Sequence, residues 1–173
     1  MASETTSEAT SLFITGLKDA HGVEHQALAL IDRQLNIIAN YPEVADMLRR
    51  HRAETEGQIQ RLDEILDGFD TKASALKDTA LSITGNLAAL AHVPAPDAII
   101  KNSFANHAFE HFEMAAYTGL LTLAELGGHQ GAVPLLRQTL EEETRMADWT
   151  LSSLPDLVRK YVARREAGET ANH

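Results

Sequence analysis

The sequence predicts an all-α protein folded as a four-helix bundle, and three observations support this prediction. Apolar residues recur at steps of three and four along four long stretches, which is the spacing of one face of a helix. Aromatic residues make up only 5% of the chain while alanine and leucine are plentiful, a composition that favours helices over sheets. Short connections join the stretches into two pairs, and one long connection separates the pairs.

The first two helices are expected to form an antiparallel hairpin. Residues 1–10 are polar and acidic and predict a disordered tail, after which Thr10 or Ser11 can cap the first helix. That helix ends near Asn40, and Pro42 is well placed to begin the second. Because only a few residues separate them, the two helices must lie antiparallel.

The second pair follows a connection that is long enough to run the length of the bundle. Within residues 70–98 the apolar spacing predicts a short extra helix, interrupted by Gly85. The third helix ends at Gly127–Gly128, and Pro155 ends or kinks the fourth. Two antiparallel hairpins joined by a long crossover are the ferritin-like form of the four-helix bundle. The bundle is therefore expected over residues 11–155, and residues 156–173 are expected to form an extension with a short C-terminal helix and a loose end.

Composition excludes several classes of function. A chain of 173 residues suits one domain, and the absence of cysteine excludes disulfides, thiolate metal sites and cysteine nucleophiles. A net charge of −10 argues against nucleic acid as a partner. There is no apolar run long enough to cross a membrane and no signal peptide at the start, so the expected compartment is the cytoplasm by default.

Polar residues interrupt the apolar stripe of every long helix at positions where a core residue is expected. The six candidates for binding metal are Glu24, His51, Glu54, Glu110, Glu113 and Glu143. Glu24 precedes Glu54 by 30 residues and Glu113 precedes Glu143 by 30 residues, which indicates an internal duplication of a helical hairpin. Five unpaired buried carboxylates at several kcal/mol each would exceed the roughly 5–15 kcal/mol by which a typical domain is stable. Since no lysine or arginine occupies these stripes nearby, we expect two bound cations to balance the charge.

The ligand types favour iron or manganese. Oxygen ligands with a single imidazole suit these metals, whereas zinc prefers a tetrahedral set of histidine or cysteine, and calcium and magnesium rarely bind histidine. The common di-iron bundle pattern contains two Glu-x-x-His motifs. Here the second helix carries the motif in reverse order, as His51-x-x-Glu54, and the third carries Glu110-x-x-Glu113. One of these two glutamates of the third helix is expected to bridge the metals, and the other to bind a single metal.

Other polar residues near these stripes have alternative interpretations. Glu143 is preferred to Glu142 as a ligand, because the phase of the helix places Glu141 and Glu142 on a solvated face. Tyr117, one turn after Glu113, is either a core residue with a bonded hydroxyl, a donor to a ligand carboxylate or an electron donor. Gln58 can hold Glu54 or pack against another glutamine. His21, one turn before Glu24, is a ligand, a partner of a ligand or a surface residue. Three other histidines are expected off the site: His25, His107 and His111.

Four segments agree in order and spacing with a known family: VEHQ (23–26), HRAETEGQIQRLDEI (51–65), FEHFEMAAYTGLLTLAELG (109–127) and LLRQTLEEET (135–144). Over about residues 11–155 the chain resembles the YciE/YciF-type ferritin-like stress proteins. The resemblance implies a ferritin-like bundle, a homodimer, and a dinuclear iron-type site at the six candidate positions.

Two functions follow as hypotheses. In the first, two iron ions, or manganese in their place, react with O2 or peroxide, and ferrous iron is oxidised. In the second, the protein is a non-catalytic metal-binding or structural dimeric stress protein. A mineral-storing cage is a third and weaker option.

Overall fold

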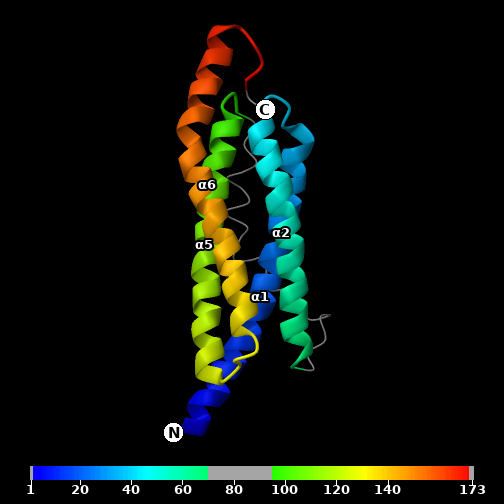
Figure 1. Ribbon diagram of the computed structural model, residues 1–173, viewed down its shortest axis with the longest axis vertical. Helices are drawn as coiled ribbons and strands as arrows, with labels where there is room; N and C mark the ends of the chain where they lie inside the picture. Colours follow the sequence, from blue (N-terminus) through cyan, green and yellow to red (C-terminus); the bar gives the residue numbers. More distant parts are fainter. Residues whose placement is uncertain (1, 70–94, 172–173) are drawn as a thin grey trace.

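The computed structural model describes residues 2–69 and 95–171, which form four long helices (Figure 1). They are α1 (Ala2–Ile37), α2 (Pro42–Asp67), α5 (Ala98–Gly127) and α6 (Val133–Glu166). The described ranges contain no strand, and the all-α prediction is confirmed. None of the described helices is both long and apolar enough to cross a membrane.

Proline and glycine set several of the helix ends. Pro42 opens α2, where its missing N–H is no loss because the first turn has no partner for it. At the other end of the bundle, Gly128 follows α5 with φ of 78°, a left-handed conformation that favours glycine. This turn lets the backbone N–H of His129 donate to the carbonyl oxygen of Ala124 at 2.8 Å, which satisfies the end of the helix.

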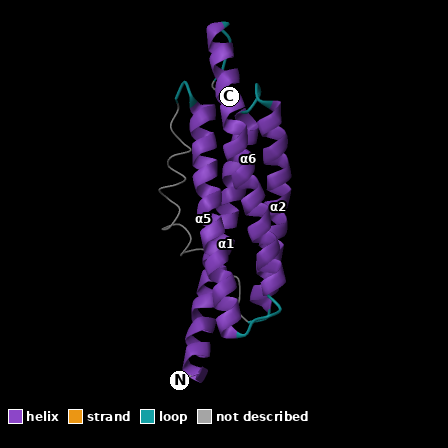
Figure 2. Ribbon diagram, turned by 60° about the vertical axis from the view of Figure 1, so that its left-hand side comes forward, coloured by secondary structure: helices purple, strands orange, loops and turns teal. Residues whose placement is uncertain are grey.

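The helices run up, down, down and up in chain order (Figure 1). Helix α1 packs on α2 and α5, and α6 packs on α5 and α2, so the four helices form a closed ring (Figure 2). Because α2 ends and α5 begins at opposite ends of the bundle, the two hairpins have the arrangement that requires a long crossover. The short extra helix expected within residues 70–98 falls on residues 70–94, outside the described part of the chain.

The first helix begins earlier than the sequence predicted. We expected residues 1–10 to be a disordered tail, but α1 already begins at Ala2. Ala9 is buried, and the Thr10 hydroxyl lies 3.0 Å from Nε2 of His129 in the α5–α6 turn. These contacts attach the start of α1 to the second hairpin, which composition alone could not indicate.

The C-terminal extension also differs from the expectation. Residues 156–166 do not form a separate short helix, because α6 continues through Pro155 to Glu166. Leu157, just beyond the proline, is buried in the core at that end. The chain then folds back, and the Tyr41 hydroxyl donates to the carbonyl oxygen of Ala171 at 2.6 Å. The described end of the chain is therefore held against the α1–α2 loop rather than loose.

Two main apolar clusters fill the bundle, one toward each end. The first joins residues from all four helices and the α5–α6 turn: Phe13, Leu17, Ala20, Leu62, Ile65, Leu66, Tyr117, Leu120, Leu121, Ala124, Ala132 and Leu136. The second is built of Ile31, Tyr41, Val44, Leu48, Ile99, Met146 and Leu157. Burial of this apolar surface is the main force that holds the helices together. Between the clusters lies a polar layer, which carries the candidate site.

Candidate metal centre

The polar layer contains four glutamates and one histidine that are almost completely buried. Glu24 comes from α1, His51 from α2, Glu110 and Glu113 from α5, and Glu143 from α6, and none is more than 4% exposed. Side chains three residues apart share a face of a helix, so both α5 glutamates point into the bundle. The sequence-based expectation that these five residues replace core residues is confirmed.

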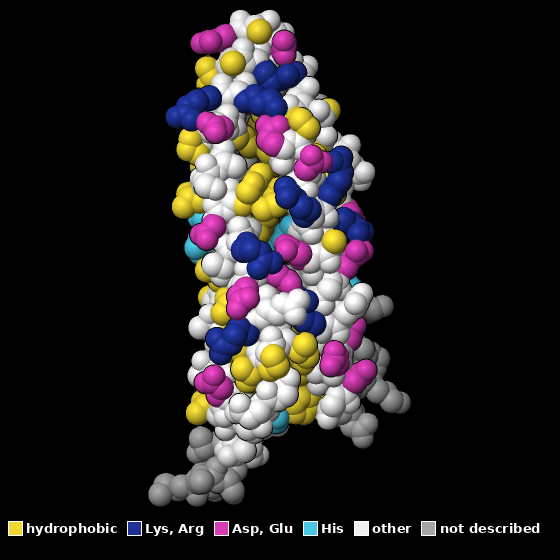
Figure 3. Space-filling view, viewed as in Figure 1, with side chains coloured by type: hydrophobic (Ala, Val, Ile, Leu, Met, Phe, Trp, Pro, Cys, Tyr) yellow, Lys and Arg dark blue, Asp and Glu magenta, His cyan; other side chains and the backbone are white. Residues whose placement is uncertain are grey.

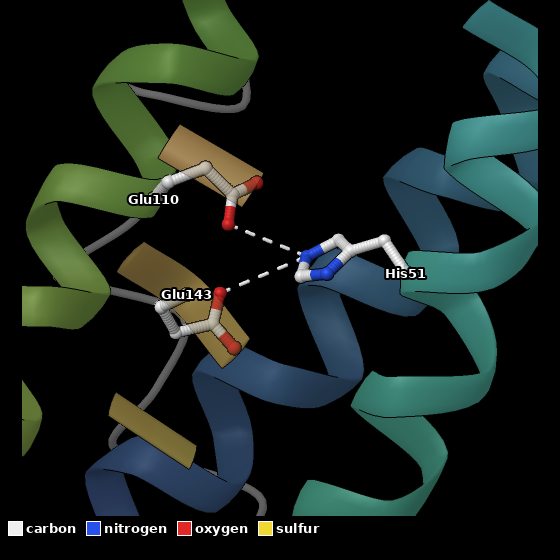
Figure 4. Close-up of side chains that lie close together, drawn as sticks. All are labelled: His51, Glu110 and Glu143. Carbon is white, nitrogen blue, oxygen red and sulfur yellow. Dashed lines mark ion pairs between the residues drawn. The ribbon is translucent and has the colours of Figure 1, made fainter. Parts of the chain in front are cut away.

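His51, Glu110 and Glu143 lie close enough to bind one ion together (Figure 4). Nε2 of His51 is 3.3 Å from Oε2 of Glu110 and 3.7 Å from Oε2 of Glu143. One ligand atom from each of the three residues lies within 4.8 Å of the others. Because the three residues come from α2, α5 and α6, folding alone brings them together, and this group could hold a metal ion.

Most of the carboxylate oxygens in the layer have no hydrogen-bonding partner among the described residues. Five such oxygens are buried: Oε2 of Glu24, Oε2 of Glu110, both oxygens of Glu113 and Oε2 of Glu143. Native proteins rarely leave buried polar atoms unpaired, and a cluster of them indicates an absent ion or proton. The oxygen-rich donor set therefore fits metal cations.

Burial and mutual repulsion raise the pKa values of Glu24, Glu113 and Glu143, which favours their protonated forms when no metal is bound. Burial raises the pKa of Glu24 to about 8, although hydrogen bonding from Tyr117 opposes the shift. Burial, followed by repulsion from Glu143, Glu24 and Glu110, raises the pKa of Glu113 well above its usual value. Burial and the nearby Glu110 have the same effect on the pKa of Glu143. A bound cation would replace these protons, so metal binding should release them.

The surroundings of His51 favour its protonated, positively charged form when no metal is bound. Burial lowers the pKa of the imidazole, but interaction with Glu110 and hydrogen bonding to Glu54 outweigh burial and raise this pKa well above its usual value. A single imidazolium cannot balance four buried glutamates. The layer therefore still depends on protons or metal ions for its charge balance.

Glu54 is placed differently from the other predicted ligands. Its side chain is 35% exposed, and its Oε2 lies 3.5 Å from Nδ1 of His51. Its other oxygen accepts a hydrogen bond from Nη2 of Arg145 at 3.0 Å. Hydrogen bonding to His51 outweighs partial burial and lowers the pKa of Glu54. The expectation that no lysine or arginine balances the charge of these glutamates is therefore wrong for Glu54, because the exposed Arg145 reaches it from α6.

A second arginine and a glutamine extend the layer, and sequence reasoning missed both roles. Glu142, expected on a solvated face, is only 6% exposed and forms an ion pair with Arg61. Arg61 also donates from Nε to Oγ1 of Thr139 at 3.1 Å. Nε2 of Gln58 donates to both Glu143 and Glu142. The spacing Gln58-x-x-Arg61, which places both donors on one face of α2, was the available signal.

Tyr117, His21 and His107 have partners that clarify their roles. The Tyr117 hydroxyl donates to Oε1 of Glu24, so this residue is both buried in the core and bonded to a candidate ligand. Nε2 of His21 lies 3.0 Å from Oδ1 of Asp63 on α2. His107 lies 3.0 Å from the hydroxyl of Thr150 through its Nδ1. Neither histidine belongs to the group around His51.

The family model described as a domain of unknown function, DUF892, matches residues 8–163. The chain belongs to the DUF892 family. The match covers α2 and α5 completely, most of α1 and α6, and every residue of the polar layer. Protein YciF of Escherichia coli strain K12 is 30% identical to this chain over 140 residues, which are 76% of this chain and 81% of YciF. The resemblance to the YciE/YciF type is confirmed.

Solved structures show the same fold. A protein from Xanthomonas campestris has a TM-score of 0.76 at 23% identity, covering 91% of this chain and 99% of that one. The stress protein YciF of Escherichia coli has a TM-score of 0.72 at 24% identity, covering 88% and 98%. This DUF892 protein therefore shares the four-helix bundle of YciF.

Proposed function

We propose that this DUF892 protein binds two iron ions in its polar layer and reduces peroxide or O2 there as part of a stress response. The observation that carries the proposal is the set of five buried carboxylate oxygens around His51 that accept no hydrogen bond from the described residues, at the middle of the bundle. A purely structural role does not account for these oxygens, because apolar residues of similar volume would be more favourable at these positions. The YciF structure, described as that of a stress protein, supports the biological context.

The residues that would hold the ions fall into two groups. His51, Glu110 and Glu143 would bind one cation, since their ligand atoms already converge. Glu24 and Glu113 would complete a second position in the same layer, because the charges of Glu24, Glu113 and Glu143 interact with one another. Glu54, at the edge of the layer, is an additional ligand candidate that touches both His51 and solvent.

Bound in this layer, two ferrous ions would supply one electron each to a molecule of hydrogen peroxide, which takes up two protons and leaves as two molecules of water. The protein supplies an environment that excludes water, because apolar clusters lie on both sides of the layer. Its carboxyl groups bind the cations by releasing the protons that burial makes them hold. Tyr117 orients Glu24 through the hydrogen bond from its hydroxyl.

The test is oxidation of iron by the isolated protein. We expect protein loaded anaerobically with Fe(II) to develop a ferric absorption band on addition of hydrogen peroxide or O2, faster than iron in buffer. Glu113→Gln should abolish this reaction and also stabilise the metal-free protein, because it removes a buried carboxyl group. Glu141→Gln, at an exposed position on α6, is the matched control and should change neither property.

Oxidation no faster than in buffer would refute the proposal and favour the non-catalytic alternative. Normal oxidation by Glu113→Gln would instead remove Glu113 from the ligand set. Iron is proposed ahead of manganese, and elemental analysis of protein purified without added metal decides between them. The homodimer that the family resemblance implies stays a prediction, which light scattering can test.

A further inference from the structure

We propose that the neutral oxidant and the metal cations reach this layer by opposite seams of the bundle, a seam being the line along which two neighbouring helices meet. The binding pocket for the oxidant is a small apolar cavity between α1 and α5. The inference rests on the proposed function, since it names the class of molecule that this same site would take. That class is a small apolar gas molecule, and the oxidant of this class is O2.

The cavity has a volume of about 20 Å³ and ends at two of the candidate ligands, His51 and Glu110. Apolar side chains from all four helices line it, among them Leu30, Leu48 and Met146. A space of this size holds about one molecule the size of water. It therefore suits a ligand of very few atoms next to the metal layer.

The outer part of the cavity carries amides rather than charges. Asn106 lines the cavity from α5 and is paired with Gln34 of α1. Nε2 of Gln34 donates to Oδ1 of Asn106 at 2.8 Å, and Nδ2 of Asn106 donates back to Oε1 of Gln34 at 3.1 Å. Of the described residues that line the cavity, only His51 and Glu110 can carry charge, and both lie in the metal layer.

The opposite seam, between α2 and α6, has the reverse character. Three ion pairs cross it: Glu54–Arg145, Glu142–Arg61 and Glu43–Lys160. Figure 3 shows basic and acidic side chains interleaved over this face. Glu54 is the candidate ligand that solvent reaches, because its side chain is 35% exposed. Helices α2 and α6 are also the least closely packed neighbours in the ring.

The charge of the entering molecule determines which of the two seams it can pass through. A divalent cation must lose its water shell to enter an apolar cavity, and, among the described residues, the outer part of that cavity offers it no carboxylate, only the Asn106 amide that is already paired with Gln34. At the α2–α6 seam, the carboxylate of Glu54 can begin to replace this shell at the surface once the cation displaces Arg145 from it. An apolar molecule such as O2 has no such penalty and gains from apolar surroundings. The two seams therefore admit different molecules to one layer.

The experiment uses O2 itself as the probe of the cavity. Metal-free protein with labelled methyl groups is placed under O2 pressure, and paramagnetic relaxation is measured by NMR. We expect the Ala105 and Leu30 methyls to relax about tenfold more strongly than those of Leu136, which is buried in the other cluster, because O2 partitions into accessible apolar space. Ala105→Val and Ala27→Val fill the cavity from α5 and from α1, and Ala108→Val, at an exposed position on α5, is the control.

Each valine variant in the cavity should lose the paramagnetic relaxation of the cavity methyl groups by O2. It should also slow Fe(II) oxidation by about tenfold, while its affinity for Co(II) stays that of the wild type. Because the two variants lie on different helices, failure of one to fold leaves the other informative. Wild-type relaxation at Ala105 no stronger than at Leu136 would overturn the inference. So would loss of Co(II) affinity in parallel with oxidation in both variants, because the positions would then support the metal layer. If O2 enters the cavity but the iron-loaded protein oxidises nothing, the proposed function is refuted while the pocket for a neutral gas stands.

Discussion

The metal-free protein should lose stability as the pH rises, and Glu24→Gln should remove part of that loss. Glu24 has a pKa of about 8 in the folded protein because it is buried, compared with an ordinary value of 4.5. Between these two pH values the folded protein binds a proton that the unfolded chain does not. The stability from this proton is fully present below pH 4.5 and is lost as the pH rises through 8.

The size of the effect follows from the shift. A difference of one proton changes the free energy of unfolding by about 1.4 kcal/mol for each pH unit. From an ordinary 4.5 to about 8, Glu24 alone accounts for about 5 kcal/mol, a large share of the stability of a typical domain. Glu113 and Glu143 also have raised pKa values, so they add to the loss in the same direction.

The assay is urea unfolding of metal-free protein in a chelator at a series of pH values. Wild-type protein should become less stable from pH 5 to pH 8, and Glu24→Gln should reduce the slope by about 1.4 kcal/mol per pH unit, because glutamine does not titrate. Glu141→Gln, which changes an exposed carboxylate, should leave the slope unchanged. A wild-type stability that is flat or rises over this range would refute the reasoning, as would equal slopes for wild type and Glu24→Gln.

Three further predictions test the contacts around the layer. Arg61→Leu should destabilise the protein by about 3 kcal/mol because it leaves the buried Glu142 without its positively charged partner, and adding Glu142→Leu should recover most of this loss in urea unfolding. Tyr117→Phe should raise the pKa of Glu24 further, because the hydrogen bond from the tyrosine lowers that pKa, and carboxyl-carbon NMR can follow it. Added Co(II) at 100 times its dissociation constant should stabilise wild-type protein by about 2.7 kcal/mol, and His51→Ala should lose this gain.

The controls are equivalent residues away from the layer. Arg137→Leu, at an exposed position, should cost little, and an equal cost for the two arginine variants would contradict the buried ion pair. Tyr161→Phe loses a hydrogen bond to the Pro96 carbonyl and should leave the Glu24 titration in place. His25→Ala, on the surface of α1, should keep the Co(II) effect. Co(II) stabilisation that persists in His51→Ala would remove this histidine from the site.

The candidate site shows where sequence reasoning succeeds and where it does not. Helical phase placed Glu24, His51 and Glu113 in the core because a stripe has a fixed period that can be read directly from the chain. The same phase misplaced Glu142, which lies at the edge of the stripe of α6. Whether an edge position is buried depends on how the neighbouring helix is rotated, and here α2 brings Arg61 over it. That rotation is not encoded in the period of either helix alone.

By itself, the sequence determined the four helices, their pairing into two hairpins, and the set of polar residues that interrupts their apolar faces. These features follow from local spacing and short connections, which act within one helix or between neighbours in the chain. Only the tertiary structure decided that Arg145 reaches Glu54 and that α6 continues through Pro155. It also decided that one seam of the bundle is charged while the opposite seam encloses an apolar cavity. These features depend on contacts between residues far apart in the chain, and the free energy of such contacts is set by burial in the assembled bundle.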